Sequence, residues 1–262
     1  MPGVYTATKK DGTIYFRASF THRAKHISLG SYSTEEQAHE AYLLAGRIFK
    51  DYSLTVEKYP ANCVLLFEKW ISLINFRDNG IYIATPIYIR PRFFYYYFSP
   101  AYFFIFDLDD LFYYSSHKIT HRGGHYFVAD YGMQVNIMNR YGIKNYAVPG
   151  KDYYFINGNT NDFRYENIEI CNLYNGVSSF IRKGKRLYRT KIHLRGNYTV
   201  GVYKTETEAA IAYNKAIDLL KKAGVKKEFT PNYMEGMSPA AYADCYASVK
   251  ISSKIKQYTA KS

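Results

Sequence analysis

Apolar and polar residues alternate in two stretches near the start of the chain, and this predicts antiparallel β-strands over residues 13–21 and 25–32. His22-Arg23-Ala24, between them, is expected to form a hairpin loop. Because successive side chains of a strand point to opposite faces of the sheet, one face should carry Phe16, Ala18 and Phe20. The opposite, polar face should carry Tyr15, Arg17, Ser19 and Thr21.

A helix is predicted next, because apolar residues then recur at intervals of three and four positions. Thr34 and Gln37 have the spacing of a capping box, in which each side chain hydrogen-bonds the backbone of the other residue, and this marks the start of the helix. The apolar stripe consists of Ala38, Ala41, Tyr42, Ala45 and Ile48 with Phe49. We expect the stripe to pack against one face of a three-stranded sheet, so any function belongs to the other face.

The same pattern occurs a second time near the C-terminus. Eight residues return with a constant displacement of 171 positions, so that Gly30, Tyr32, Thr34, Glu35, Ala38, Ala41, Tyr42 and Ala45 recur as Gly201, Tyr203, Thr205, Glu206, Ala209, Ala212, Tyr213 and Ala216. Thr205 and Glu208 repeat the capping box. Eight matches in register indicate a duplicated supersecondary unit.

The strand before the second copy carries the densest positive charge of the chain. No acidic residue interrupts a run of basic residues made of Arg182, Lys183, Lys185, Arg186, Arg189, Lys191 and Arg195. The face away from the helix should carry Leu187, Arg189, Lys191 and His193. The face toward the helix should carry Tyr188, Thr190 and Ile192. A face that is merely solvated would carry both positive and negative side chains. The absence of acidic residues here therefore indicates that the strand binds an anionic partner.

Both copies resemble the AP2/ERF DNA-binding domain. The resemblance rests on the strand pattern of residues 16–20, on the stretch from Leu29 to Tyr42 and on the stretch from Val200 to Tyr213. In that family a three-stranded sheet lies in the DNA major groove and its outward side chains read bases. The resemblance therefore implies that both sheets contact double-stranded DNA.

The candidate nucleic-acid-binding residues are Arg17, Ser19, Thr21, Arg23, His26, Ser28, Arg186, Arg189, Lys191, His193 and Arg195. The first copy departs from the family pattern, because His26 and Ser28 stand where the last strand usually has Arg and Trp. Its middle strand also lacks the usual acidic residue. The family's preference for particular DNA sequences therefore does not carry over to this chain.

The segments between and after the two copies give simpler predictions. Residues 62–76 are expected to form a buried helix with Trp70 in the core. The most apolar run, residues 93–106, is interrupted by Ser99-Pro100 and is shorter than the roughly 20 residues that span a bilayer, so we expect two strands joined by a turn. Residues 233–262 should form a short helix that starts at Ser238-Pro239, followed by a flexible basic arm.

Residues 153–168 resemble the signature of HNH nucleases. The matching positions are Ile156-Asn157-Gly158, Asp162, Arg164 and Glu166-Asn167-Ile168. The resemblance implies a ββα fold in which a strand precedes the Ile-Asn-Gly sequence and a helix carries the Glu-Asn-Ile sequence. In that family an Asp-His or His-His pair directly before Ile-Asn-Gly supplies a metal ligand and a general base.

Tyr154 and Phe155 occupy the two positions that carry this chemistry. Phenylalanine can neither bind a metal nor accept a proton, and tyrosine, with an ordinary pKa of about 10, is a poor base at neutral pH. Asn167 is a weak candidate ligand, because one amide does not make a metal site. A hairpin with its tip at Arg122-Gly123-Gly124 explains the spacing of His117, His121 and His125 better than a metal site does. We expect no catalytic residue and no cofactor, with Mg²⁺ required only if the chain is a nuclease.

Composition describes a folded, basic protein. Of the 262 residues, 47% are hydrophobic, which supplies a core, and the formal net charge of +13 favours an anionic polymer as partner. The 30 Tyr and 17 Phe residues fit rings that stack on bases or rings that fill cores, and the second interpretation is favoured. Three separated cysteines, Cys63, Cys171 and Cys245, and no visible secretory signal lead us to expect an intracellular, reducing compartment and no membrane.

These patterns predict an α+β chain in which two AP2-like modules, each a three-stranded antiparallel sheet plus a helix, surround a central mixed, HNH-like ββα domain. The expected boundaries are residues 1–53, 54–180, 181–232 and 233–262. The predicted function is non-catalytic binding of double-stranded DNA, with sequence-specific regulation as one form of it. Two alternatives stay open, an HNH homing-type endonuclease with an atypical metal site and a structural RNA-binding component of a ribonucleoprotein. The oligomeric state is also open.

Overall fold

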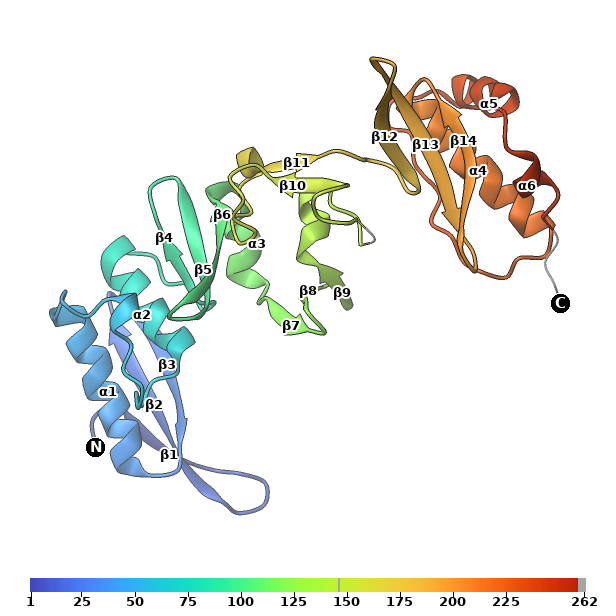
Figure 1. Ribbon diagram of the computed structural model, residues 1–262. Coiled ribbons are helices and arrows are strands. Elements are labelled where there is room, and N and C mark those ends of the chain that lie inside the picture. The colour runs from blue at the N-terminus through green and yellow to red at the C-terminus, as the bar shows by residue number, and fades with distance from the viewer. Residues whose placement is uncertain (146, 259–262) are drawn as a thin grey trace. The chain divides into compact units, whose positions relative to one another are not determined.

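The computed structural model describes residues 1–145 and 147–258 (Figure 1). These residues form an α+β fold with four three-stranded antiparallel sheets and one two-stranded sheet. The chain divides into two compact units. The first unit is Met1–Tyr141 with Phe155–Ile168, and the second is Gly142–Tyr154 with Glu169–Ser262. The predicted α+β class with small three-stranded sheets is therefore confirmed.

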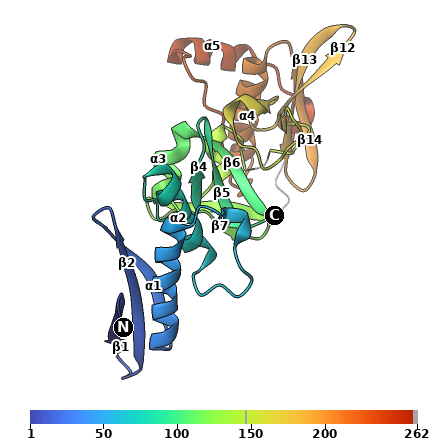
Figure 2. The same cartoon turned by 90° about the vertical axis from the view of Figure 1, so that its left-hand side faces the viewer.

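The first sheet contains β1 (Val4–Thr8), β2 (Ile14–His22) and β3 (Lys25–Tyr32), in that order. Helix α1 (Glu35–Lys50) covers one of its faces (Figure 2). Thr34 caps the helix as predicted, since its Oγ1 accepts a hydrogen bond from the Gln37 N–H at 3.2 Å. The stripe residues Ala38, Ala41, Ala45 and Ile48 are fully buried.

The second sheet repeats this design with β12 (Val177–Arg182), β13 (Lys185–His193) and β14 (Asn197–Tyr203), followed by helix α4 (Glu206–Lys222). Its capping box is complete. Thr205 Oγ1 accepts from the Glu208 N–H at 3.1 Å, and the Glu208 carboxylate accepts from the Thr205 N–H at 3.2 Å. Both predicted helices, their Thr caps and the strands before them are thus confirmed, whereas the capping box predicted at Thr34 and Gln37 is only half formed, because Gln37 Oε1 accepts from the Ser33 hydroxyl instead.

The two sheets share a β-bulge that the repeated sequence does not predict. In the first sheet Ala18 pairs with Gly30 while Ser19 pairs with Ser28, so Leu29 is an extra residue on β3. In the second sheet Thr190 pairs with Gly201 while Lys191 pairs with Thr199, which makes Val200 the extra residue on β14. Such a bulge bends the strand and re-aims its side chains.

In both sheets a glycine in the left-handed region, just before the first strand, accepts a hydrogen bond from the middle strand at the level of the bulge. The Ser19 N–H donates to the Gly3 carbonyl at 2.9 Å, and the Lys191 N–H donates to the Gly176 carbonyl at 2.8 Å. Both glycines have φ near +70°, at 72° for Gly3 and 71° for Gly176. A Cβ on Gly3 would lie 2.1 Å from the ring of Tyr42, and one on Gly176 would lie 2.5 Å from the ring of the equivalent Tyr213. These positions therefore need glycine for both conformation and space.

The rest of the first unit consists of short elements. The helices are η1 (Val56–Lys58), α2 (Phe67–Asn79), η2 (Leu108–Asp110), α3 (Leu111–Ser116), η3 (Ile137–Tyr141) and η4 (Tyr165–Asn167). The strands are β4 (Ile87–Ile89), β5 (Phe93–Ser99), β6 (Tyr102–Asp107), β7 (Thr120–Arg122), β8 (His125–Asp130) and β9 (Met133–Asn136). The chain crosses between the units at β10 (Tyr153–Phe155) and β11 (Ile168–Ile170), which form the two-stranded sheet.

Helix α2 and the first sheet share one hydrophobic core. Trp70 is 0% exposed in it, as predicted. The helix itself begins at Phe67, later than expected, because the residues before it form a turn in which the Tyr59 hydroxyl donates to the Leu65 carbonyl at 2.8 Å. Buried Arg77 then ties α2 to the end of α1, where its guanidinium donates to the carbonyls of Ile48, Asp51 and Leu54. The first sheet and residues beyond position 53 are thus packed together.

Two further predictions for the first unit are confirmed and one is wrong. The apolar run forms β5 and β6, joined by a turn, and Arg122-Gly123-Gly124 is the tip of the hairpin of β7 and β8. The helix expected over Glu166-Asn167-Ile168 is a single 3₁₀ turn, η4, that leads directly into β11. Ile168 is already the first residue of β11, which pairs with β10, so the turn does not continue as a helix. No helix in residues 1–145 and 147–258 is long and apolar enough to cross a bilayer.

The C-terminal segment of the second unit is packed on the unit up to Tyr258, which corrects the prediction of a flexible arm. Helix α5 (Pro239–Ser248) starts at its predicted cap, Ser238, and α6 (Ser253–Lys256) follows. Between them, the Ser252 N–H donates to the Val200 carbonyl at 2.8 Å, along the free edge of β14. Ile251 and Ile255 are buried because their apolar side chains join the core of α4. Residues 259–262 of the expected arm lie outside the described residues.

Candidate nucleic-acid interface

The face of the second sheet opposite α4 is called here the second open face. The register places on it Ser178, Phe180 and Arg182 from β12, Lys185, Leu187, Arg189, Lys191 and His193 from β13, and Asn197, Thr199 and Val202 from β14. Thr190 and Ile192 point the other way and are buried, with the Thr190 hydroxyl donating to the Ala209 carbonyl of α4 at 2.7 Å. The predicted division of this strand into a basic face and a helix-facing face is confirmed for these residues.

Arg189 lies at the centre of the second open face. Its guanidinium carbon is 4.5 Å from the ring centroid of Phe180 on β12, a cation–π contact that holds the planar group over the sheet. Lys191 and His193, further along β13, are exposed. The His193 ring nitrogen Nδ1 lies 3.1 Å from Oδ1 of Asn197 across the hairpin. The centre of this face therefore combines an oriented guanidinium with an extended ammonium.

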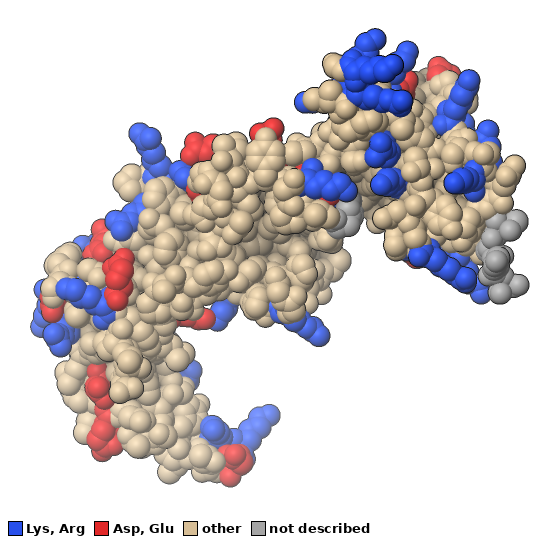
Figure 3. Space-filling model, in the orientation of Figure 1, with Lys and Arg blue, Asp and Glu red and all other residues tan. Residues whose placement is uncertain are grey.

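The hairpin of β12 and β13 adds a second group of cations. Its turn is Lys183-Gly184, with φ of 50° and 72°, which is the left-handed pair of a tight hairpin turn. Figure 3 shows Lys and Arg side chains gathered over the end of this hairpin. Arg186 is exposed there but pairs with Ile181, on the same face as Tyr188 and not on that of Arg189. Arg186 is a candidate binding residue, but period two places it on the opposite side of the strand from Arg189.

These cations are not neutralised by acidic side chains of the described chain. In the described part of the second unit, no Lys or Arg nitrogen lies within 4.0 Å of a carboxylate oxygen. The loop residue Arg195 is exposed as well. The charge of the second open face is therefore available to an external anion.

The equivalent open face of the first sheet is much less basic. Among its predicted residues, Arg17, Thr21, Arg23, His26 and Ser28 are exposed, and Arg17 pairs with Tyr5 and Ser31 on the neighbouring strands. Ser19 is only 8% exposed, so the expectation that it is open to a ligand is wrong. It occupies the position that Lys191 has in the second sheet.

Sequence reasoning missed β12, whose first four residues, 177–180, lay in the expected central domain. Phe180, which orients Arg189, was missed with it. A signal is present in the sequence, because Val177-Ser-Ser-Phe-Ile is followed by the turn-forming Lys183-Gly184. The hairpin register then follows from the turn.

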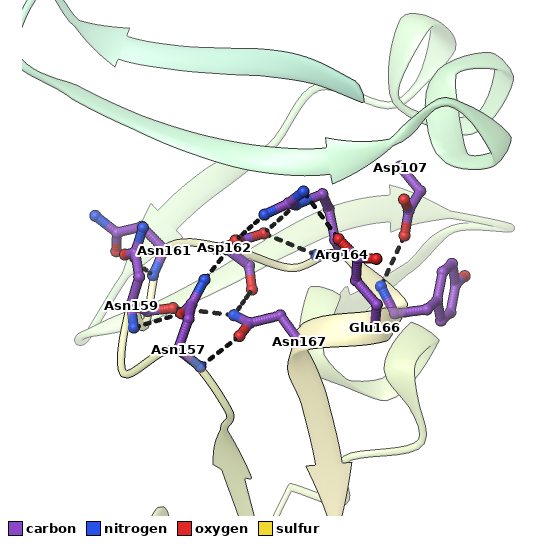
Figure 4. Close-up of polar contacts among 9 residues, drawn as sticks. Asp107, Asn157, Asn159, Asn161, Asp162, Arg164, Glu166 and Asn167 are labelled. Atoms are coloured by element: carbon purple, nitrogen blue, oxygen red, sulfur yellow. Dashed lines mark hydrogen bonds and ion pairs between the residues drawn. The ribbon is translucent and has the colours of Figure 1, made fainter. Parts of the chain in front are cut away.

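The loop that resembles the HNH signature is held by its own polar side chains (Figure 4). Asn167 is 4% exposed; its Oδ1 accepts from the Asn157 N–H at 2.8 Å and its Nδ2 donates to the Asp162 carbonyl at 2.8 Å. Asp162 accepts from the Arg164 guanidinium at 2.9 and 2.7 Å. Burial alone would raise the pKa of Asp162, but hydrogen bonds from Arg164 and Asn157 outweigh burial and lower it. Both polar atoms of Asn167 are thus engaged in closing the loop.

Tyr154 lies in β10 and is partly exposed. Hydrogen bonding to Glu169 raises the pKa of its hydroxyl, so even less of the phenolate is present at neutral pH to accept a proton. Among the described residues, no group of three or more His, Cys, Asp and Glu side chains is arranged to hold a metal ion. Comparison of the chain with protein-family models, curated proteins and solved structures finds no significant match.

Proposed function

We propose that the chain binds double-stranded DNA without catalysing a reaction, and that the second open face is its main contact surface. The observation that carries the proposal is the set of Arg189, Lys191 and the hairpin cations on one sheet, with no carboxylate within 4.0 Å of them in the described chain. Phosphate contacts of Lys and Arg supply most of the affinity of DNA-binding proteins. The three-stranded sheet backed by a helix also agrees with the resemblance to AP2/ERF domains.

The first sheet takes a secondary part in this proposal. It offers Arg17 and Arg23 to the same duplex and fewer charges than the second sheet. Because one chain carries both modules, binding of one raises the effective concentration of the other, and each can be weak alone. The two different faces then contact different parts of one site.

The non-catalytic part of the proposal rests on the HNH-like loop. Asn167 is engaged through both polar atoms, and Phe155 replaces a residue that would need to bind metal or accept a proton. We expect no nicking of supercoiled plasmid with Mg²⁺ or Mn²⁺. Metal-dependent nicking that disappears in Asn167→Ala, and also in the milder Tyr154→Phe, would favour the endonuclease instead.

The test of DNA binding is a titration of a fluorescent duplex at several salt concentrations. If six or so cations contact phosphates, the logarithm of the association constant should fall against the logarithm of salt concentration with a slope of about −5. A structured RNA competes in the same assay at one fixed salt concentration. Affinity that is independent of salt, or a stronger preference for the RNA, would overturn the proposal.

A further inference from the structure

A pocket of about 550 Å³ opens within the second unit beside the second open face. Its size lies within the range of small-ligand sites, which is roughly 300–1,000 Å³. The side chains that matter for its chemistry are Lys151, Lys191, Lys227, Asn197, Tyr174 and Phe229. Lys191 and Asn197 belong also to the open face, so the pocket and the proposed DNA surface are continuous.

The pocket has a fixed wall. Three asparagines with 8%, 6% and 8% exposure, Asn175, Asn214 and Asn232, bond one another and the backbone around them. The Asn175 N–H donates to Asn232 Oδ1 at 2.6 Å, and the Asn232 N–H donates to Asn214 Oδ1 at 2.7 Å. This network ties the segment before β12 to α4 and to the segment that carries Phe229, so the pocket is formed before any ligand arrives.

Three lysines are among the residues that line the pocket. The Lys227 ammonium donates to the His193 carbonyl at 2.9 Å and lies 5.6 Å from the Phe229 ring centroid. Lys151 and Lys191 have no carboxylate within 4.0 Å among the described residues. Two acids, Asp152 and Glu228, also line the pocket. The Asp152 carboxylate is already engaged, because it accepts from the Val148 N–H and the Asn172 amide.

We propose that this pocket binds one nucleoside phosphate, with the phosphate at the three lysines and the base against the rings of Tyr174 and Phe229. Ammonium groups suit a phosphate, aromatic rings suit the face of a base, and the Asn197 amide can hydrogen-bond a base edge. Two sources share this chemistry, an unpaired nucleotide of a bound strand and a free mononucleotide. The first source rests on the proposed DNA-binding function, because the strand must lie on the open face, while the second does not.

The experiment compares three fluorescent duplexes of one sequence on the full chain: a perfect duplex, a duplex with one extra unpaired nucleotide, and a duplex with an abasic residue at that place. If the pocket takes up the unpaired nucleotide, the duplex that contains it should bind about tenfold more tightly than the perfect duplex, as expected for one stacked base. The abasic duplex should lose most of that gain. In parallel, a deoxynucleoside 5′-monophosphate is titrated by calorimetry.

The variants are Lys151→Glu and Lys227→Glu, with Lys254→Glu, at an exposed position of α6, as a control of equal charge change. Either pocket variant should abolish the gain from the unpaired nucleotide, whereas the control should keep it. Binding of the mononucleotide alone, lost in the pocket variants, would support the pocket with a free nucleotide as its ligand. If the unpaired base gives no gain in affinity and the mononucleotide does not bind, the pocket is not a nucleotide site. The proposed DNA-binding function is tested separately, by the affinity for the perfect duplex, and it stands if that affinity is unchanged in the pocket variants.

Discussion

The two sheets have the same backbone design and different open faces. The bulge, the left-handed glycine that bonds the middle strand at the same level and the tyrosine against that glycine occur in both. At equivalent positions of the middle strands, Arg17 corresponds to Arg189, and Ser19 to Lys191. The duplicated residues therefore maintain the scaffold, while the residues that differ decide how much positive charge each sheet presents.

The edges of the two sheets also differ. In the first sheet the Tyr32 hydroxyl donates to the Leu29 carbonyl of its own strand at 3.2 Å. In the second sheet the equivalent Tyr203 hydroxyl donates to the Lys250 carbonyl at 2.8 Å, and the Ser252 N–H bonds the edge strand. Covering an edge strand in this way prevents it from pairing with other chains. The same tyrosine thus serves its own strand in one copy and anchors a C-terminal segment in the other.

The largest expected effect comes from removing the cations at the bulge of the second sheet. We expect Arg189→Ala/Lys191→Ala to weaken duplex binding roughly 30- to 100-fold and to make the salt slope shallower by about 2, because two phosphate contacts are lost. The matching change in the first sheet, Arg17→Ala, should weaken binding only about five- to tenfold. Anisotropy titrations at two salt concentrations measure both.

A circular dichroism spectrum unchanged in each variant is the control for folding. Equal losses in the two sheets would contradict the difference between the faces. Unchanged affinity in the double variant would remove the second open face from the proposed interface altogether.

The sequence predicted those parts of the two modules that depend on local spacing. The helices, their Thr caps and the alternation of β13 follow from neighbouring residues. It did not reveal how far the duplication extends. The displacement is 171 between Gly30 and Gly201 but 173 between Gly3 and Gly176, because the hairpin loops differ in length. Each hairpin of the first copy is one residue longer than its counterpart in the second. For this reason a comparison at one constant displacement does not detect the first strand of the second copy.

The remaining errors come from contacts between residues far apart in the chain. Ser19 is buried where its N–H bonds the Gly3 carbonyl beside β1, and the C-terminal segment is ordered because α4 and β14 offer it a core and an edge. The turn η4 forms because β11 pairs with β10. No periodicity in the segment itself encodes such pairings. They depend on tertiary packing, which overrides local propensity.

An intermediate effect is expected from adding a positive charge to the open face of the first sheet, which is the less basic of the two. Ser28 is exposed on β3, next to the bulge at Leu29, and pairs with Ser19. Ser28→Lys should tighten duplex binding about fivefold and steepen the salt slope by about 1, since one phosphate contact is gained. Thr199→Lys, at the equivalent position of the second sheet, is the matched variant. If the first variant changes neither quantity while the second changes both, the first sheet does not touch the duplex.

A smaller effect is expected when the hydroxyl of Tyr203 is removed, and none at the same site when that of Tyr32 is removed. Burial raises the pKa of both Tyr32 and Tyr203 to about 12, so each hydroxyl keeps its proton at neutral pH. Tyr203→Phe should cost about 1 kcal/mol of local stability and speed hydrogen exchange of the Ser252 N–H about fivefold, because the Lys250 carbonyl loses its donor. Tyr32→Phe should leave that amide unaffected. Faster exchange in both variants, or in neither, would show that Tyr203 does not anchor the segment.

The smallest expected effect tests why one capping box is complete and the other is not. Gln37 uses its Oε1 to accept from the Ser33 hydroxyl at 2.9 Å, whereas the Glu208 carboxylate accepts from the backbone N–H groups of Lys204 and Thr205, both at 3.2 Å. Gln37→Glu should therefore stabilise the first unit by about 0.5 kcal/mol, since a carboxylate suits the positive end of a helix. Urea unfolding followed by the fluorescence of Trp70, which shares a core with α1, measures this directly. Glu208→Gln is the matched variant, followed by circular dichroism of the second unit. If Gln37→Glu leaves the unfolding midpoint unchanged while Glu208→Gln destabilises the second unit, repulsion from Glu35 and Glu36 prevents a carboxylate at position 37 from accepting the Thr34 N–H.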